Sequence, residues 1–222
     1  MDTVLKEFVL KEHDTVDIST DVQQRVSVGC GKCYLFIKRF ADFILSLFGL
    51  LVLSVPMAVI AVLIRIDSQG PAIFKQERIG KNGRIFVIYK FRTMKKDAPH
   101  DVASCRLENS EQHVTKFGQF LRRTSIDELP QLINILRGDM SIIGYRPVCL
   151  TEEKLNHLRE EYGVFVLRPG ITGLAQVSGR DNINYKDKAR LDAQYVSMCS
   201  ARTDILCLLR TIKIVISGEG VN

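Results

Sequence analysis

Tryptophan, glycine-rich phosphate loops and internal repeats are all absent from this 222-residue sequence. Neither a G-x-G-x-x-G nor a Walker-type loop occurs, so a kinase or an ATPase would lack the backbone cradle that holds its phosphates. The sequence also has no low-complexity tract, and hydrophobic residues make up 46% of it, which excludes a largely disordered protein. The length suits one domain with a short additional segment.

The cysteines lack the spacing of a disulfide framework or of a zinc site. Cys30 and Cys33 form a single C-x-x-C, and zinc would need a second such pair or histidines at ligand spacing. The remaining cysteines and the histidines are scattered along the chain: Cys105, Cys149, Cys199, Cys207, His13, His100, His113 and His157. We therefore expect six reduced, structural thiols in a cytosolic setting.

One long apolar run is present, at residues 43–64, where 22 consecutive residues carry no charge. At about 1.5 Å per residue, a helix of this length would cross the hydrocarbon core of a bilayer. The run begins too far into the chain for a cleaved signal peptide. Positive charge marks the cytoplasmic side of a membrane segment, and here both flanks are basic: Lys32, Lys38 and Arg39 before the run, and Arg65, Lys75, Arg78, Lys81 and Arg84 after it.

The middle of the run contains Ser54, Val55 and Pro56. Proline removes an amide donor and kinks a helix, and a nearby serine hydroxyl can satisfy a backbone carbonyl that loses its partner. These residues leave two interpretations open. The helix either enters the membrane, bends at Ser54–Pro56 and returns to the same face, or spans the membrane as an ordinary kinked helix.

The rest of the chain predicts one β-hairpin and several helices. Asn82-Gly83 separates two alternating apolar stretches, and both residues tolerate the positive φ angles of a hairpin turn. Residues 97–111 are polar and predict a loop. Helices are predicted at 116–123, 129–137, 152–162, 185–198 and 203–217, of which the first and last combine apolar and basic residues that suit a membrane interface.

The charge balance points to an anionic partner. The chain has 31 basic and 25 acidic residues, a net charge of +6. Such a balance favours a membrane surface, a phosphorylated substrate or a nucleic acid. We do not expect nucleic-acid binding, because no recognisable module for it is present.

The most informative stretch is residues 122–147, RRTSIDELPQLINILRGDMSIIGYRP. Asp127 and Glu128 are adjacent carboxylates before an apolar helix. Ser125 and Glu128 have the spacing of a capping box and Pro130 suits a first helical turn, so simple capping is one interpretation. The other is a phosphate site, because arginines crowd around the pair: Arg122, Arg123, Arg137, Arg146 and, upstream, Arg92. There a carboxylate could hold Mg²⁺ or attack phosphorus.

The sequence resembles the monotopic phosphoglycosyl transferases of the bacterial sugar transferase family from about residue 38 to the C-terminus. The matching stretches are KRFADFILS, the Ser54–Pro56 break, GPAIFKQERIGKNGRIFVIYKFRTM, the block at 122–147, LRPGITGLAQVSGR and ARLDAQYV. The resemblance implies an α+β, mostly helical fold, with a re-entrant membrane helix hairpin at 32–67 and a small cytosolic catalytic domain at 68–222. Residues 1–31 would form an arm of unknown role.

The resemblance also implies an activity on the cytoplasmic face of the bacterial inner membrane. A sugar-1-phosphate would pass from a UDP-sugar to polyprenol (undecaprenyl) phosphate with release of UMP, initiating glycoconjugate or polysaccharide biosynthesis. Asp127 would form the covalent phospho-sugar intermediate, and Glu128 would support Mg²⁺ and the phosphate. The residues expected to bind substrate or phosphate are Lys90, Arg92, Arg122, Arg146 and Asp192.

Two residues depart from the family pattern: Tyr145 replaces a usual proline in the loop that carries Arg146, and Val55 separates Ser54 from Pro56. The alternative from another class is a non-catalytic, membrane-bound module that binds anionic ligands. The identity of the sugar and the oligomeric state are not readable from the sequence.

Overall fold

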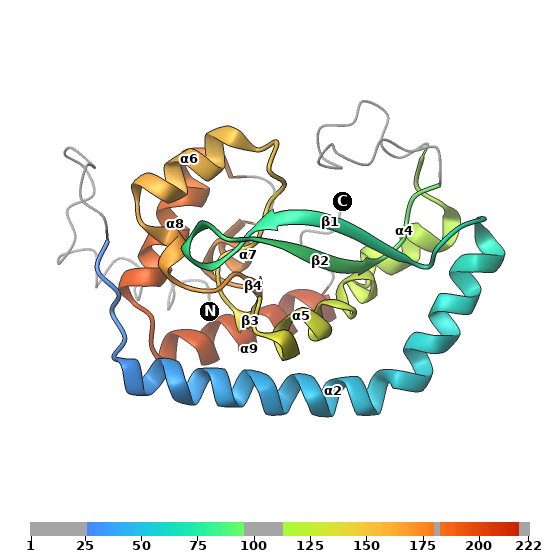
Figure 1. Cartoon of the computed structure of the whole chain (residues 1–222), viewed down its shortest axis with the longest axis horizontal. Coiled ribbons are helices and arrows are strands. Elements are labelled where there is room, and N and C mark those ends of the chain that lie inside the picture. The colour runs from blue at the N-terminus through green and yellow to red at the C-terminus, as the bar shows by residue number, and fades with distance from the viewer. Residues whose placement is uncertain (1–25, 96–112, 180–182, 218–222) are drawn as a thin grey trace.

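The computed structural model describes residues 26–95, 113–179 and 183–217 (Figure 1). The predicted loop at 97–111, most of the predicted N-terminal arm and Cys105 lie outside these residues. The described elements are mostly helical, with two small sheets, as expected for the α+β class: α2 (Lys32–Asp67), β1 (Ile73–Ile79), η2 (Lys81–Gly83), β2 (Ile85–Phe91), α4 (Lys116–Arg123), η4 (Ile126–Glu128), α5 (Gln131–Arg137), β3 (Ser141–Ile143), α6 (Glu153–Glu161), η5 (Val164–Val166), β4 (Gly170–Thr172), α7 (Leu174–Gly179), α8 (Tyr185–Ser197) and α9 (Ala201–Ser217).

Helix α2 coincides with the predicted membrane segment and is continuous over its 36 residues, with Pro56 inside it. Figure 1 shows the second half of α2 turning away from the direction of the first half. The Ser54 hydroxyl donates to the carbonyl of Leu51 at 2.8 Å, one residue before the Val52 carbonyl that Pro56 leaves without its usual donor. The bend is therefore present, within one helix rather than between two.

Most side chains of α2 are exposed within the described part of the chain, although one side of the helix packs against α5, α4 and β3. Among the described residues it is the one helix long and apolar enough to cross a membrane. Its large apolar side chains are exposed at Phe36, Ile37, Phe40, Phe43, Ile44, Leu45, Leu47, Phe48, Leu51, Val52, Val55, Val59, Val62, Leu63 and Ile66. A helix that is apolar on nearly all sides and largely exposed is typical of a membrane segment.

The predicted hairpin is confirmed. Strands β1 and β2 are antiparallel, with Ile73 opposite Phe91 and Ile79 opposite Ile85. Asn82 and Gly83 turn the chain with φ of 56° and 72°, which an asparagine and a glycine adopt at little cost. This register sets Lys90 near the end of β2, where the strand meets α5.

The core consists of three groups of buried side chains. The largest joins β3, α6, α7, α8 and α9. The second joins Ile64 of α2 to Phe91 of β2 and Leu121 of α4. The third joins Ile88 of β2 to Ile135 of α5. Leu121 of the second group precedes η4 in the chain, and Ile135 of the third group follows it. These two groups therefore hold η4 against the hairpin.

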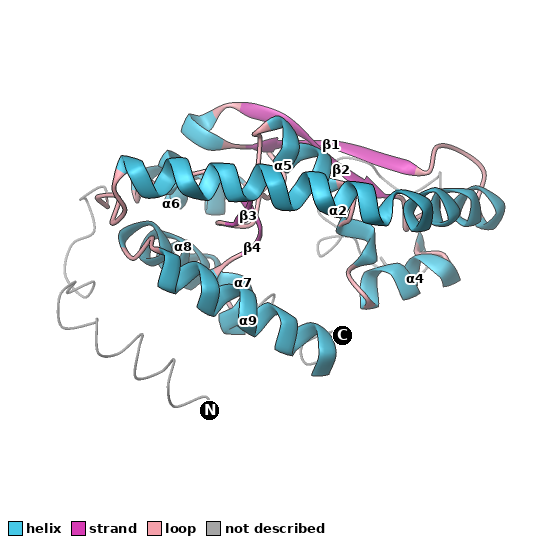
Figure 2. Cartoon of the chain, turned by 90° about the horizontal axis from the view of Figure 1, so that it is seen from below, coloured by secondary structure: helices cyan, strands magenta, loops and turns pink. Residues whose placement is uncertain are grey.

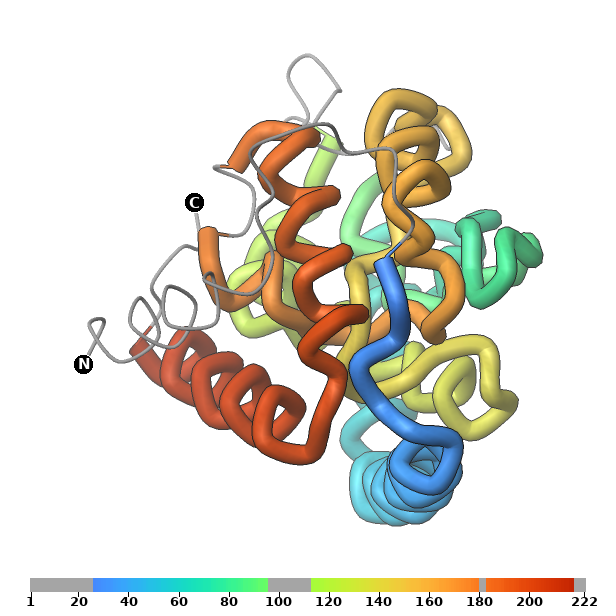
Figure 3. Tube along the Cα trace, turned by 90° about the vertical axis from the view of Figure 1, so that its left-hand side faces the viewer, coloured from blue at the N-terminus to red at the C-terminus, as the bar shows by residue number. Residues whose placement is uncertain are grey.

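The predicted helices are confirmed to within two residues at either end, and 116–123 matches α4 throughout. Glycine ends α5 at Gly138 (φ 92°) and follows α6 at Gly163 (φ 74°), as expected for left-handed caps. Helix α9 leaves an apolar side exposed, at Ile205, Leu208, Leu209, Ile212, Val215 and Ile216. Figures 2 and 3 show α9 on the same lower side of the molecule as the first half of α2.

Candidate active site

Asp127 and Glu128 lie in η4, the short turn between α4 and α5. The capping-box interpretation of these residues is wrong. Ser125 has a left-handed backbone (φ 57°, ψ 15°), and its side chain makes no capping hydrogen bond. A non-glycine residue in this conformation is uncommon. It redirects the chain after α4, so that both carboxylates of η4 are placed beside β2.

Glu128 is held by two cations from distant parts of the chain. Lys90 Nζ and Arg146 Nη2 each lie 2.7 Å from Oε1, and Arg146 Nη1 lies 3.4 Å from Oε2. Burial alone would raise the pKa of Glu128, but the charges and hydrogen bonds of Arg146 and Lys90 outweigh it and hold this pKa well below its usual range. Glu128 is therefore an anion over the physiological pH range.

Asp127 differs from its neighbour. Its nearest cation is Lys90, with Nζ 4.0 Å from Oδ2, and within the described residues no group donates a hydrogen bond to its carboxylate. Burial raises the pKa of Asp127, and the charge of Glu128 raises it further, while Lys90 and the arginines act in the opposite direction. An oxygen without a hydrogen bond keeps its lone pairs available for reaction with an electrophile.

Buried polar residues position both cations, and the sequence did not single them out. Asn134 of α5 accepts from the Tyr89 amide at 3.0 Å and donates to the Val87 carbonyl at 2.7 Å, which fixes β2 on either side of residue 88 and just before Lys90. The sequence signal that could have indicated Asn134 was a single asparagine on the apolar side of a short helix. Its full burial explains why both of its hydrogen-bonding ends are used.

Arg159 plays the corresponding part for Arg146. It is fully buried, donates from Nη1 to the Arg146 carbonyl at 2.9 Å, and lies over the Tyr145 ring at 5.3 Å. Asp192 accepts from Arg159 Nε at 2.8 Å and from Nη2 at 2.6 Å. Asp192, which we expected near the substrate, is thus buried behind Arg146 and acts on the site through Arg159.

The two other predicted phosphate ligands, Arg122 and Arg92, differ in what they contact. Arg122 lies close enough for its charge to act on Asp127, and its Nε donates to Thr93 Oγ1 at 2.8 Å. Arg92 instead donates to the carbonyls of Ser68 and of Gln69, the latter at 3.0 Å, where α2 ends. Arg92 therefore holds the end of α2 and is not directed at the carboxylates.

The metal-binding capacity of the site is limited to the two carboxylates. Among the described residues no group of three histidine, cysteine, aspartate or glutamate side chains could hold a metal ion. Mg²⁺ keeps several waters and is commonly bound by one or two carboxylates together with substrate phosphates. Asp127 and Glu128 fit that weaker kind of site, although Glu128 would have to share its oxygens with Lys90 and Arg146.

The described cysteines form no disulfide, and Cys30 Sγ lies 2.6 Å from Cys199 Sγ. Cys33 is exposed, whereas Cys149, Cys199 and Cys207 are buried. None of them lines the site around Asp127.

A family model described as bacterial sugar transferase matches residues 33–218. The chain belongs to this family. It is 42% identical over 199 residues to the galactosyl transferase CpsE of Streptococcus agalactiae, an alignment that covers 84% of this chain and 44% of the relative. It is 34% identical over 200 residues to the undecaprenyl-phosphate galactose phosphotransferase of Salmonella typhimurium, covering 83% of this chain and 41% of the relative.

A shorter relative matches over nearly its whole length. The uncharacterized sugar transferase EpsL of Bacillus subtilis is 36% identical over 187 residues, which cover 84% of this chain and 91% of the relative. The chain thus spans less than half the length of the first two relatives and most of the third. The family match covers the membrane helix, the hairpin and the carboxylate pair.

Proposed function

We propose that the protein transfers a sugar-1-phosphate from a UDP-sugar to polyprenol (undecaprenyl) phosphate, releases UMP, and so begins the assembly of a polysaccharide or related glycoconjugate. Family membership and the activity for which the Salmonella relative is named support this proposal. The observation that carries it is the difference between the two adjacent carboxylates. Glu128 is saturated by cations, while Asp127 beside it accepts no hydrogen bond within the described residues.

The first step forms a bond between an Asp127 carboxylate oxygen and the phosphorus attached to the sugar. The bond from that phosphorus to the oxygen bridging the two phosphates breaks, and UMP leaves with the electron pair. In the second step a phosphate oxygen of polyprenol phosphate attacks the same phosphorus and displaces the Asp127 carboxylate. The enzyme is regenerated and the lipid carries a diphosphate-linked sugar, a double displacement by covalent catalysis.

Lys90, Arg146 and Arg122 would stabilise the charge that gathers on the transferring phosphate. Lys90 lies between the two carboxylates, so it can move from Glu128 toward a bound phosphate over a short distance. Arg146 has the more exposed side chain of the Glu128 partners, and a guanidinium can bind two phosphate oxygens at once. Glu128 would keep both cations in place before the substrate arrives.

Magnesium is proposed as the cofactor, bound by Glu128 together with the diphosphate of the donor. When bound, it would neutralise phosphate charge and make the UMP oxygen a better leaving group. The protein's own part is to supply the carboxylates and to keep Lys90 and Arg146 nearby. The expected result of chelator treatment is loss of turnover that added Mg²⁺ restores.

We further propose that α2 is re-entrant, with both ends on the cytoplasmic face of the bacterial inner membrane, and that α4 and α9 lie in the interface. The basic flanks, the bend at Pro56 and the exposed apolar side of α9 support this arrangement. It would set Asp127 near the height of lipid headgroups, where a polyprenol phosphate presents its phosphate.

UMP release from a panel of UDP-sugars, with undecaprenyl phosphate as acceptor, tests the activity and identifies the sugar. Asp127→Asn should abolish both UMP release and labelling of the protein by a donor radiolabelled in its sugar. Asp187→Asn, at an exposed position of α8, is the matched control and should retain both. Full activity of Asp127→Asn would remove Asp127 as the nucleophile. If no UDP-sugar gives UMP but the double variant of Asp127 and Glu128 still binds lipid or nucleotide, the non-catalytic module is favoured instead.

A further inference from the structure

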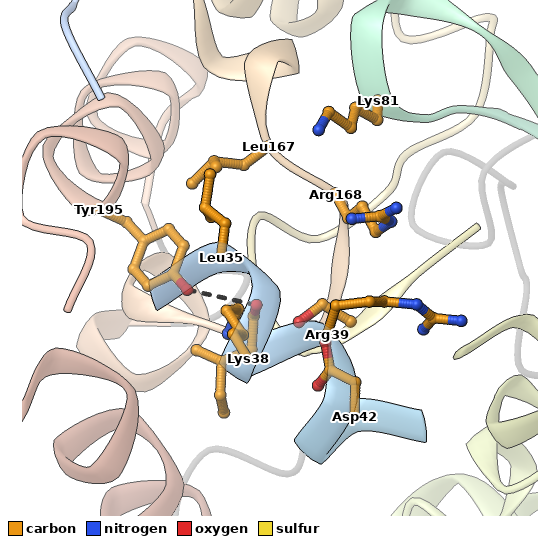
Figure 4. A pocket seen from close by; sticks show the side chains of 10 residues that line it. Leu35, Lys38, Arg39, Asp42, Lys81, Leu167, Arg168 and Tyr195 are labelled. Carbon is orange, nitrogen blue, oxygen red and sulfur yellow. Dashed lines mark hydrogen bonds between the residues drawn. The ribbon is translucent and has the colours of Figure 1, made fainter. Parts of the chain in front are cut away.

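A small cavity lies at the start of α2, away from the carboxylate pair. It has a volume of about 30 Å³, room for roughly two waters or for the free oxygens of one phosphate group. Lys38, Arg39 and Asp42 line it from α2, Lys81 from the hairpin turn, and Arg168 from the segment before β4 (Figure 4). Four cations and one carboxylate therefore surround this space.

Most of these charges have a partner that is not a carboxylate. Arg39 donates to the carbonyls of Ile135 at 2.6 Å and Leu136 at 3.0 Å, and Arg168 donates to the Gly138 carbonyl at 2.8 Å. These three carbonyls and two guanidinium groups meet at the C-terminal end of α5. No carboxylate of the described residues forms an ion pair with Arg39 or Arg168.

The remaining charged groups largely offset one another, so the excess of positive charge comes from Arg39 and Arg168. Lys38 pairs with Asp204 of α9, and Asp42 accepts from the Ile142 amide at 3.0 Å. Lys81 forms neither an ion pair nor a side-chain hydrogen bond with any described residue. Burial lowers the pKa of Lys81, and so does the charge of Arg168, because these two like charges lie close together.

A buried hydroxyl also lies in the wall of the cavity. Ser141 is 2% exposed, and within the described part of the chain its Oγ makes no hydrogen bond of normal geometry, although it lies close enough to the Asp42 carboxylate to interact with it. A buried hydroxyl without a partner costs free energy. A hydroxyl is both a donor and an acceptor, so the oxygen of an anion in the cavity would satisfy it.

We propose that this cavity binds a phosphate-type oxyanion through Lys81, Arg39, Arg168 and the Ser141 hydroxyl. Capping of α5 accounts for Arg39 and Arg168 alone. Among the described residues it leaves Lys81 without an ion pair and the Ser141 hydroxyl without a hydrogen bond of normal geometry. An oxyanion satisfies all of them, since it offers several acceptor oxygens and offsets the positive charge. The position is consistent with a lipid source, because Phe36, Ile37 and Phe40 on the same turns of α2 are exposed where the apolar run begins.

This site is separate from the proposed reaction and does not rest on it. The cavity adjoins the C-terminal end of α5, whereas Asp127 and Glu128 precede the N-terminal end of that helix. An anion there would not reach the reacting phosphorus. It would instead fix Arg39 of α2 and Arg168 against α5, and so hold the membrane helix to the element that follows the carboxylates.

The test compares Lys81→Gln with Arg84→Gln in the full chain. The two residues lie on the same turn and lose the same charge, but Arg84 is exposed and does not line the cavity. In neutral detergent, inorganic phosphate should raise the unfolding temperature, because a ligand that binds the folded state stabilises it. Inorganic phosphate can also bind the cations near Asp127. Both variants retain those cations, so the readout is the difference between the two variants in their response to phosphate.

We expect Lys81→Gln to weaken the response to phosphate about tenfold in concentration, Ser141→Ala to weaken it by a smaller factor, and Arg84→Gln to leave it unchanged. The second arm measures the unfolding temperature in phosphatidylcholine nanodiscs with and without phosphatidylglycerol. Loss of the phosphatidylglycerol effect in Lys81→Gln alone assigns the site to a lipid headgroup. Loss of the phosphate effect alone assigns it to a soluble phosphate compound. Equal responses of Lys81→Gln and Arg84→Gln to both probes would overturn the proposal.

Discussion

Asp127 and Glu128 are joined by one peptide bond, yet their surroundings act on them in opposite directions. Glu128 is bound by Lys90 and Arg146, which stabilise its ionised form. Asp127 is buried beside the charge of Glu128, and both effects destabilise its ionised form. A pair of like groups whose pKa values are driven apart is a common way to assign two roles within one site.

This contrast predicts opposite effects of the two amide substitutions on stability. The folded-state pKa of Asp127 is raised, so its ionisation at pH 7 opposes folding and Asp127→Asn should raise the unfolding temperature. The pKa of Glu128 is lowered, so Glu128 contributes stability at neutral pH that disappears as the pH falls below its unfolded-state value. Glu128→Gln should cost about 2 kcal/mol through loss of charge-assisted hydrogen bonds. Thermal unfolding in detergent at pH 7 measures both effects, and a lower unfolding temperature for Asp127→Asn would contradict the first.

The raised pKa of Asp127 also predicts the acidic side of the pH–rate profile. Asp127 must be ionised to attack phosphorus, and its raised pKa moves the loss of activity to a higher pH than an ordinary aspartate would give. Lys90→Gln removes the cation that most opposes this shift, so its acidic limb in kcat/KM should move to still higher pH. A profile of Lys90→Gln that superimposes on the wild-type profile after scaling would show that Lys90 does not act on Asp127.

Asp192 allows a test of the support behind Arg146. Asp192→Asn leaves the Arg159 guanidinium buried without its anion, a change that costs about 3–5 kcal/mol. Asp187→Asn removes an exposed pair with Arg190 on the same helix, which is worth less than about 1 kcal/mol. Unfolding temperatures of the two variants should differ accordingly. Equal, small losses would mean that Arg159 finds another partner.

At the scale of elements, local signals predicted the fold well. The hairpin at Asn82-Gly83 and the glycine ends of α5 and α6 depend on the backbone preferences of one or two residues. These preferences can be read directly from the sequence. The capping box at Ser125 was wrong because the spacing of side chains does not reveal that Ser125 adopts a left-handed backbone. Residue spacing alone cannot distinguish a capping serine, whose backbone is usually extended, from a serine with a left-handed backbone.

Contacts between elements were less predictable. Lys90 and Arg146 reach Glu128 from positions 38 and 18 residues away in the chain, and this convergence depends on the packing of β2 and the β3–α6 segment around η4. The sequence and the family resemblance indicated Arg146, and the resemblance indicated Lys90, whereas Asn134 and Arg159 were not predicted. We expected Asp192 and Arg92 at the site. In the structure Asp192 accepts hydrogen bonds from Arg159, and Arg92 donates to carbonyls at the end of α2.

The bend in α2 can be tested with thiols at its two ends. Cys33 is exposed at the first end, and Gln69→Cys supplies an exposed thiol just after the second. A membrane-impermeant maleimide, followed by peptide mass spectrometry, should label both in inverted membrane vesicles and neither in right-side-out vesicles. Labelling of one thiol in each orientation would establish a spanning helix. With Pro56→Ala added, a straighter helix should bring one end to the opposite side.

At the scale of the whole molecule, exposed apolar side chains are concentrated on α2 and α9, while α6 carries charge on its outer side. The absence of tryptophan from the chain turns this asymmetry into a measurement. Ile216→Trp on α9 would be the sole indole, and brominated lipids in vesicles should quench its fluorescence. Glu160→Trp on α6 is the control and should not be quenched. Equal quenching of the two would contradict an interfacial position for α9.

Helix α5 connects the proposed reaction site to α2. Asp127 and Glu128 precede this helix, and Arg39 of α2 donates to the carbonyls of Ile135 and Leu136 near its end. Its seven residues rise by roughly 10 Å, so α5 acts as a spacer between the carboxylates and α2. If α2 enters the bilayer as we propose, one inserted residue would lengthen this spacer by only about 1.5 Å but would rotate the carboxylates by about 100°, and they would then face away from the lipid acceptor.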